Sequence, residues 1–237
     1  MNKDDWYESW KIHLEQYLKA PPRTGIYIHA HFPRINSSLE IACGSSRDSI
    51  YLAKKQVEAT ASDYEYRVID ELKKRFIHRK LKYQQADAFE LPFNDNAFDM
   101  VFHNGFFILF ENNQDIKTMI VEQARVSRKY VLFFVHNKRN RDLVRQFGKL
   151  APNDSIYDIR FFEPNEIERI ASEANIDRCS LKILKFGGKC DLLYSKQLKR
   201  FILNIAYPWR TVVIPRLYEM QKWEKTERIG CLIELNK

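Results

Sequence analysis

The sequence is poor in the residues that mark several classes of protein. Its 237 residues include only four cysteines, which are Cys43, Cys179, Cys190 and Cys231. No two of them form a C-x-x-C pair, and scattered cysteines are typical of reduced, buried thiols in a reducing compartment. Apart from the loosely spaced His29 and His31, no pair of histidines or cysteines stands at ligand spacing, so we expect no zinc or other metal site.

Long apolar runs are missing as well. None reaches the roughly 18 residues of a membrane-spanning helix, and no basic-then-apolar leader opens the chain, so we expect no membrane span and a cytoplasmic location. The sequence also has no internal repeat and no low-complexity tract. Hydrophobic residues make up 45% and aromatic residues 14% of the chain. This composition argues against disorder and predicts one domain around a single core.

One stretch of the chain carries most of the excess positive charge. The formal net charge is +8, and residues 189–228 hold nine lysines and arginines against four acidic residues. A basic segment can contact nucleic acid, bind an acidic substrate or simply form a solvated face. Within it, Leu198, Phe201, Ile202 and Ile205 recur at helical spacing, which favours a helical cap over a platform for nucleic acid.

The most informative segment is LEIACGSSRDSIYLA, residues 39–53. It predicts a short buried strand, a tight turn at Gly44 and an amphipathic helix. Glu40 stands at the end of the strand, and Asp63 follows Gly44 by 19 residues, at the end of the next expected strand. Doubly wound α/β proteins use this arrangement to bind a nucleoside, with the second acid on the ribose hydroxyls.

Glu40 narrows the choice of nucleoside. A dinucleotide places its pyrophosphate at such a turn, where the helix N-terminus favours negative charge. A carboxylate four residues before Gly44 would repel a pyrophosphate, but it suits a ligand that carries an ammonium group. S-adenosylmethionine is such a nucleoside, with an amino-acid tail and no phosphate. The turn therefore favours a methyl donor over NAD.

Residues 38 to about 138 resemble the class I S-adenosylmethionine-dependent methyltransferases, in their type-11-like branch that acts on small molecules. That family writes its first motif as acid-x-Gly-x-Gly-x-Gly, and this chain has Glu40, Ala42, Gly44 and Ser46 at those places. The run that ends at Asp48 also matches the [ST]-x-x-[DE] signature of a helix cap.

Two later segments resemble the same family in the same order. QQADAFELPFNDNAFDMVFHNGF, residues 84–106, is similar to GDAxxLPFxDxxFDxV, and FFEPNEIERIASEANI, residues 161–176, is similar to the FTPEELxxLLxxAGF helix. The resemblance implies that Asp87 bonds the adenine amino group and that Ala88 offers its backbone N–H to the ring. It also implies a Rossmann-like, doubly wound α/β fold with a seven-stranded sheet whose last strand is antiparallel.

The predicted site lies at the carboxyl ends of the strands, where open α/β sheets bind ligands. The expected cofactor-binding residues are Glu40, Ala42, Cys43, Gly44, Asp63, Tyr64, Asp87, Ala88, His103 and Asn104. His103 and His136 end two expected strands, and each is a candidate general base because the unperturbed pKa of histidine lies near neutrality. Each could equally be a strand-end residue bonded to a neighbouring loop. Cys43 has no evident activating partner and is expected to be a packed thiol.

The remaining pattern predicts the elements around that site. An amphipathic helix is expected over 5–18, ended by Pro21 and Pro22. Strands are expected over 38–43, 58–62, 82–86, 98–103, 130–135, 180–186 and 228–235, and helices over 47–55, 66–79, 114–126 and 164–174. Together they predict a single methyltransferase domain, with an N-terminal helical arm (1–37), a Rossmann-like core (38–186), a helical insertion (187–228) and a final strand (229–237).

The sequence thus predicts an enzyme that transfers a methyl group from S-adenosyl-L-methionine to a small molecule, with the N-terminal helix and the insertion closing over the acceptor. An RNA- or protein-modifying methyltransferase is an alternative, because the insertion is basic. Against it, the fourth strand ends in His103-Asn104-Gly105-Phe106, without the [DNS]-P-P-[FYW] pattern of enzymes that methylate base amino groups. A nucleoside-binding pseudo-enzyme is a third possibility, because Ala42 and Ser46 replace motif glycines. The acceptor atom and the oligomeric state do not follow from the sequence.

Overall fold

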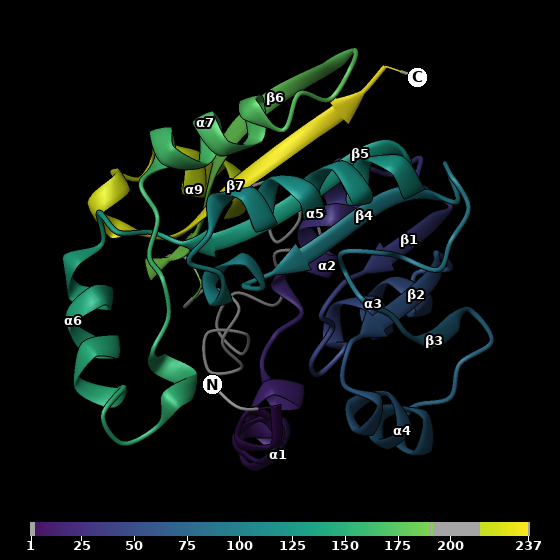
Figure 1. Ribbon diagram of the computed structural model, residues 1–237, viewed down its shortest axis with the longest axis horizontal. Helices are drawn as coiled ribbons and strands as arrows, with labels where there is room; N and C mark the ends of the chain where they lie inside the picture. Colours follow the sequence, from purple (N-terminus) through teal and green to yellow (C-terminus); the bar gives the residue numbers. More distant parts are fainter. Residues whose placement is uncertain (1–2, 190, 192–213, 237) are drawn as a thin grey trace, which may run out of the picture.

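The computed structural model describes residues 3–189, 191 and 214–236 (Figure 1). Its centre is a seven-stranded sheet in the order β3-β2-β1-β4-β5-β7-β6. The strands are β1 (Ser37–Glu40), β2 (Glu58–Asp63), β3 (Leu81–Gln85), β4 (Phe98–Asn104), β5 (Ser127–His136), β6 (Cys179–Gly188) and β7 (Thr226–Leu235). Strands β1 to β5 run parallel, and β7 pairs antiparallel with both β5 and β6. This confirms the predicted Rossmann-like sheet with an antiparallel last strand.

Helices cover both faces of the sheet; in Figure 1, α5 lies in front of it and α2 behind it. The helices are α1 (Lys3–Lys19), α2 (Arg23–His31), α3 (Arg47–Lys54), α4 (Tyr66–Arg75), α5 (Asn113–Val126), α6 (Arg141–Leu150), α7 (Pro164–Glu173) and α9 (Ile214–Met220). Single 3₁₀ turns form η1 (Phe107–Leu109), η2 (Ser155–Tyr157) and η5 (Trp223–Lys225). None of the helices within the described ranges is long and apolar enough to cross a membrane.

Strand β5 shows why the continuous apolar run was a good predictor of a buried strand. Side chains alternate across a strand, and Phe133 and Val135 pack into the cluster that holds the apolar faces of α5 and α7. Leu132 and Phe134 pack into the opposite cluster, which holds the apolar residues of α1 to α4. Both faces of β5 are therefore buried, as a central parallel strand requires.

Helices α1 and α2 form the N-terminal arm. The amphipathic pattern predicted for 5–18 is confirmed, because Trp10 and Leu14 of α1 are buried against the sheet. The sequence reasoning stopped at Pro21 and Pro22 and missed α2. Proline ends one helix but is tolerated in the first turn of the next, and α2 begins directly after Pro22.

Helix α6 was also missed, and it stands out at the edge of the molecule (Figure 1). Its apolar residues, at 143, 144, 147 and 150, follow helical spacing, but none of its residues is fully buried. The predicted insertion is described only at its two ends: β6 continues to Gly188, and α9 and η5 precede β7. The helix predicted from the pattern of 198–205 lies outside the described residues.

Candidate functional site at the carboxyl ends of β1, β2 and β4

The loop after β1 has an unusual backbone. The sheet order reverses between β1 and β4, and open α/β sheets bind their ligands at such a switch point. Three residues of this loop have left-handed backbone conformations: Ala42 (φ +48°), Gly44 (φ +50°) and Ser46 (φ +54°). Residues other than glycine rarely adopt positive φ, so the loop keeps its tight curvature without the family's two other glycines.

Asp63 ties this loop to the end of β2. Its Oδ2 accepts a hydrogen bond from the backbone N–H of Gly44 at 3.1 Å, and its Oδ1 accepts one from the N–H of Glu65 at 3.1 Å. Burial raises the pKa of Asp63 to about 6. Each carboxylate oxygen can accept a second hydrogen bond. The ribose contact of Asp63 therefore stays a prediction that its geometry allows.

Two further carboxylates are buried beside the loop. Glu40 accepts the backbone N–H of Ser49 at 3.0 Å, and Asp48 accepts that of Gly25 at 2.7 Å. Burial and the neighbouring Asp48 raise the pKa of Glu40. The predicted cap at the start of α3 is wrong: Ser46 has a left-handed backbone conformation instead of the extended one typical of a capping residue, and its side chain makes no capping bond.

The charge of this region fits the predicted methyl donor. Glu40, Asp48 and Asp63 are at most 6% exposed. Among the described residues, these three carboxyl groups form one ion pair, which is the 3.9 Å contact of Asp48 with the Nε of Arg47. Buried like charges disfavour ionisation, and a cation nearby favours it. A ligand with ammonium and sulfonium groups would compensate this charge, whereas a pyrophosphate would add to it.

Helix α1 closes the loop from outside. A Cβ atom at Gly44 would lie 3.6 Å from Nε1 of Trp10, which is ordinary van der Waals contact. The guanidinium of Arg47 donates to the backbone carbonyl of Tyr17 at 3.1 Å, so α1 is also bonded to the start of α3. The thiol of Cys43 is buried, and burial raises its pKa well above the usual range. The geometry gives Cys43 the packing role that the sequence predicted.

The adenine side of the site is open. Tyr64 is 50% exposed, just past β2. Asp87 is exposed, and its Oδ1 accepts the N–H of Phe89 at 2.9 Å, while Ala88 is buried. Asp63 and Gln85 are register partners at the ends of β2 and β3, so these residues follow neighbouring strand ends. Their contacts with the donor remain predictions.

The two candidate histidines lie in different surroundings. His103 is fully buried among Phe106, Phe107 and Phe133, and its ring stacks on that of Phe133 at 5.5 Å. Neither ring nitrogen has a hydrogen-bond partner among the described residues. Burial lowers the pKa of His103 to about 3, so the ring is neutral at physiological pH. This position favours packing, and the catalytic role of His103 stays a prediction without structural support.

His136 faces a different group of side chains. It ends β5, and its Nδ1 has no hydrogen-bond partner among the described residues. Its ring lies 5.0 Å from that of Phe147 and 5.6 Å from that of Phe161. Burial and the charge of Arg228 hold the pKa of His136 well below the usual range. A neutral imidazole at a strand end, beside half-buried aromatic rings, fits the predicted site better than His103 does.

A row of aromatic rings runs from β5 to α1, and the sequence reasoning missed it. The row, called the aromatic wall below, consists of His136, Phe161, Phe147, Tyr157, His13 and Tyr17. Consecutive ring centroids are 5.3 to 6.3 Å apart. His13 also bonds Asp154 at 2.7 Å. The helical spacing of 143, 144, 147 and 150 could have revealed α6, but the partners of Phe147 come together only in the fold.

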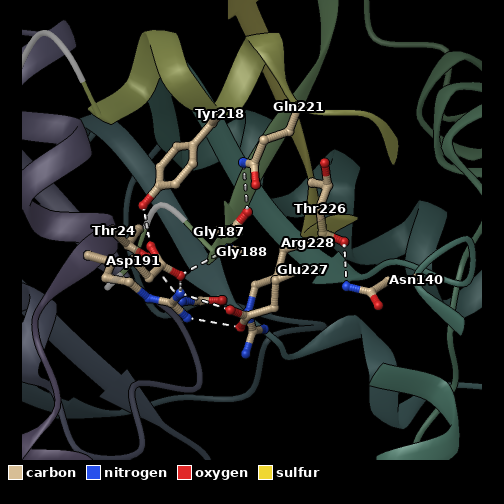
Figure 2. Close-up of polar contacts among 12 residues, drawn as sticks. Thr24, Asn140, Gly187, Gly188, Asp191, Tyr218, Gln221, Thr226, Glu227 and Arg228 are labelled. Carbon is tan, nitrogen blue, oxygen red and sulfur yellow. Dashed lines mark hydrogen bonds and ion pairs between the residues drawn. The ribbon is translucent and has the colours of Figure 1, made fainter. Parts of the chain in front are cut away.

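A polar network closes the other side of the site (Figure 2). Arg23 of α2 donates two hydrogen bonds of 2.9 Å to the carboxylate of Glu227 and is also paired with Asp191. Asp191 in turn bonds the hydroxyl of Tyr218, which points toward it in Figure 2. This network fastens α2 and α9 to the start of β7. No group of three metal-ligating side chains occurs in the part of the chain that the structure describes.

Known proteins resemble both the sequence and the fold. Residues 39–135 match the family model of the methyltransferase domain. Over 96 residues, the chain is 29% identical to the ubiquinone/menaquinone biosynthesis C-methyltransferase UbiE of Desulfotalea psychrophila, a match that covers 40% of this chain and 38% of that protein.

Two solved structures show how far the likeness of fold extends. A SAM-dependent methyltransferase of Thermotoga maritima, described as a possible histamine N-methyltransferase, superposes with a TM-score of 0.59 at 13% identity and covers 98% of this chain and 100% of that one. The plantazolicin methyltransferase BpumL in complex with SAH has a TM-score of 0.59 at 16% identity, with 99% and 90% covered.

The fold and the loop after β1 therefore resemble those of the class I methyltransferases. The matched domain spans β1 to β5, which carry the donor-side residues described above. Residues 39–135 thus match the methyltransferase domain, and the fold around them is that of the class I S-adenosylmethionine-dependent methyltransferases.

Proposed function

We propose that this protein transfers a methyl group from S-adenosylmethionine to a small-molecule acceptor. The observation that carries the proposal is the set of three buried carboxyl groups around the loop after β1, Glu40, Asp48 and Asp63, whose negative charge burial disfavours until a cation is nearby. A donor with two positive groups compensates that charge.

The protein contributes mainly position and exclusion of water. When bound, S-adenosylmethionine supplies a methyl group already activated for in-line displacement. The carboxylates beside Gly44 hold the donor, and α1 shields the loop. Holding two reactants in the right geometry can correspond to effective molarities of about 10⁵–10⁸ M, so orientation alone can supply most of the acceleration.

His136 is the residue that we propose as proton acceptor, where the acceptor molecule must lose a proton. Its Nδ1 is unpartnered among the described residues, and its low pKa keeps the imidazole neutral and able to accept a hydrogen bond from a hydroxyl. The same low pKa makes it a weak base. It therefore orients an acidic hydroxyl better than it removes a proton from a weakly acidic one.

The aromatic wall supports a small acceptor. Its rings outside β5 are half-buried, so they offer an apolar surface of a few side chains beside the strand ends. Small-molecule sites commonly combine such a surface with a few convergent polar groups. An RNA or protein acceptor was predicted to contact the basic insertion, most of which lies outside the described residues, and no described contact favours it.

Calorimetric titration tests the donor site. We expect both S-adenosylmethionine and S-adenosylhomocysteine to bind. Glu40→Gln keeps an oxygen to accept the N–H of Ser49 and removes the carboxyl that a bound cation would ionise, so it should weaken binding of S-adenosylmethionine about tenfold, or about 1.4 kcal/mol. Glu58→Gln is the matched control, because Glu58 is exposed at the start of β2 and pairs with Lys80. Failure of both ligands to bind would overturn the proposal.

Transfer of label tests the acceptor class. S-adenosylmethionine labelled in its methyl group is incubated with the protein and a cell extract, and the products are dialysed. We expect protein-dependent label in molecules that pass the membrane. Label retained with RNA or protein would contradict the small-molecule acceptor and leave the donor site unaffected.

A further inference from the structure

Arg228 brings an unsatisfied guanidinium nitrogen to the ligand-binding edge of the sheet. Its Nε donates to Oε1 of Glu227 at 3.2 Å. Its Nη1 is shielded from solvent and has no hydrogen-bond partner among the described residues. Leaving a buried charged donor unpaired is costly, and nearly all such groups in folded proteins find a partner. The geometry calls for an acceptor atom from a ligand.

Gly105 provides the space for this nitrogen. It follows β4 with a φ of +85°, and a Cβ there would lie only 3.0 Å from Nη1 of Arg228. The Arg228 side chain therefore reaches from β7, past β5, to the end of β4. That place adjoins the switch point between β4 and β1, where a methyl acceptor has to meet the donor.

Two other unsatisfied polar atoms lie at the same edge. The Oδ1 of Asn104 and the Nδ1 of His136 are buried and have no partner among the described residues. His136 and Arg228 are register partners across β5 and β7, so their side chains lie on the same face of the sheet. Asn104 directly precedes Gly105 and is held by its Nδ2, which donates to Thr24 at 3.0 Å.

The carboxylates near Arg228 are directed mainly to Arg23. Glu227 gives both of its carboxylate oxygens to Arg23, at 2.9 Å each, and shares only one of them with Arg228. Asp191 is directed to Arg23 and to the hydroxyl of Tyr218 (Figure 2). Among the described residues, Arg228 thus shares its one carboxylate partner, Glu227, with Arg23, which has Asp191 as a second partner, and burial lowers the pKa of Arg228. A ligand anion would complete the pairing.

The aromatic wall indicates the chemistry of the ligand's apolar part. Its rings begin at His136, the register partner of Arg228, and end at Tyr17, whose carbonyl is bonded to Arg47 at the donor loop. The wall therefore spans the distance from the unpaired guanidinium to the donor side. Aromatic rings pack favourably against other rings, in stacked or edge-to-face arrangements.

We propose that Arg228 binds a carboxylate carried by the methyl acceptor, whose aromatic ring lies against the aromatic wall. The inference deepens the proposed function and rests on it for the identity of the second substrate. Guanidinium groups bind carboxylates through paired, charge-assisted hydrogen bonds. The donor's own amino-acid carboxylate has the same chemistry, so the experiment has to separate the two sources.

Ligand-observed NMR with benzoate and benzamide tests the inference, because the two probes share the ring and differ in charge. The wild-type protein should bind benzoate at least tenfold more tightly than benzamide. Arg228→Met, which keeps the apolar stem, should abolish that preference. Arg145→Met is the control, because Arg145 is exposed on α6, and it should keep the preference. An equal affinity of the wild type for both probes overturns the inference, whether or not the variant folds.

A second arm adds saturating S-adenosylhomocysteine. Benzoate should still bind, because the acceptor and the donor occupy different places. Displacement of benzoate would assign the anion site to the donor's carboxylate and overturn the inference. If S-adenosylhomocysteine itself does not bind, the proposed donor fails, while the preference for benzoate over benzamide still decides the role of Arg228.

Discussion

Replacing Asp63 by asparagine should change how the stability of the protein depends on pH. The pKa of this carboxyl is raised from 3.8 to about 6 in the fold, mainly by burial. In the unfolded chain it returns to its ordinary value. As the pH rises from about 4 to 6, the unfolded chain releases its proton first, so this group lowers the stability of the folded state. Above the folded pKa the loss is complete.

The size of the effect follows from the two pKa values. A shift of one pKa unit corresponds to about 1.4 kcal/mol, so between pH 4 and pH 8 the wild type should lose roughly 2 to 3 kcal/mol relative to Asp63→Asn. The variant leaves either the N–H of Gly44 or that of Glu65 without an oxygen. This should cost about 1 kcal/mol at every pH. The variant is then the less stable protein at pH 4 and the more stable one at pH 8.

Urea unfolding at pH 4, 5, 6, 7 and 8 measures this difference. Asp70→Asn is the control, because Asp70 is exposed and pairs with Lys74 on the surface of α4, where such a pair contributes at most about 0.5 kcal/mol. Parallel curves of wild type and Asp63→Asn across the whole range would refute the reasoning. In the same series, S-adenosylhomocysteine should bind the wild type more tightly above pH 6, because ribose hydroxyls stabilise the ionised carboxylate.

Two further predictions concern packing. Gly25→Ala should lower the free energy of unfolding by roughly 1–3 kcal/mol, since its Cβ would lie 2.8 Å from the carbonyl oxygen of Asp48. Gly148 on α6 has open space around it, so Gly148→Ala should be neutral or stabilising by up to about 1 kcal/mol. Equal losses of stability for the two variants in urea unfolding would contradict this prediction. Brief treatment with iodoacetamide should modify the exposed Cys179 and spare the buried Cys231, as measured by peptide mapping. Burial raises the pKa of Cys231 far above the usual range. Equal modification of the two cysteines in the native protein would contradict that burial.

The donor half of the site was predictable because its signals are local. The residues from Glu40 to Gly44 form one turn, and Asp63 stands at the end of the next strand. The spacing alone therefore indicated that Asp63 lies close to this turn. Strand β5 was predictable for a similar reason, since a run buried on both faces needs no partner to be recognised. The structure confirms the sheet and its antiparallel last strand.

The acceptor half was not predictable, because it depends on contacts between distant segments. Helix α2 contains Gly25, which has poor helix propensity, and its place is fixed by packing against α3. The unpaired nitrogen of Arg228 indicates a binding site only because it lies beside Gly105, which follows β4, and because Arg228 pairs in register with His136 of β5. The cap expected at Ser46 is wrong because the tight loop after β1 gives this residue a left-handed backbone conformation.

The position of Trp10 has a consequence for the speed of turnover. Its indole lies beside Gly44, so with the donor bound as proposed, α1 has to shift before a spent cofactor can leave past this loop. Besides the packing of Trp10, Leu14 and other side chains of α1, polar contacts tie α1 to the body, among them those of His13 with Asp154 and of the carbonyl of Tyr17 with Arg47. Such ties break and reform readily in water, which makes product departure, rather than the chemical step, a natural limit on the rate. The fluorescence of Trp10 would then report the movement of α1 in each catalytic cycle.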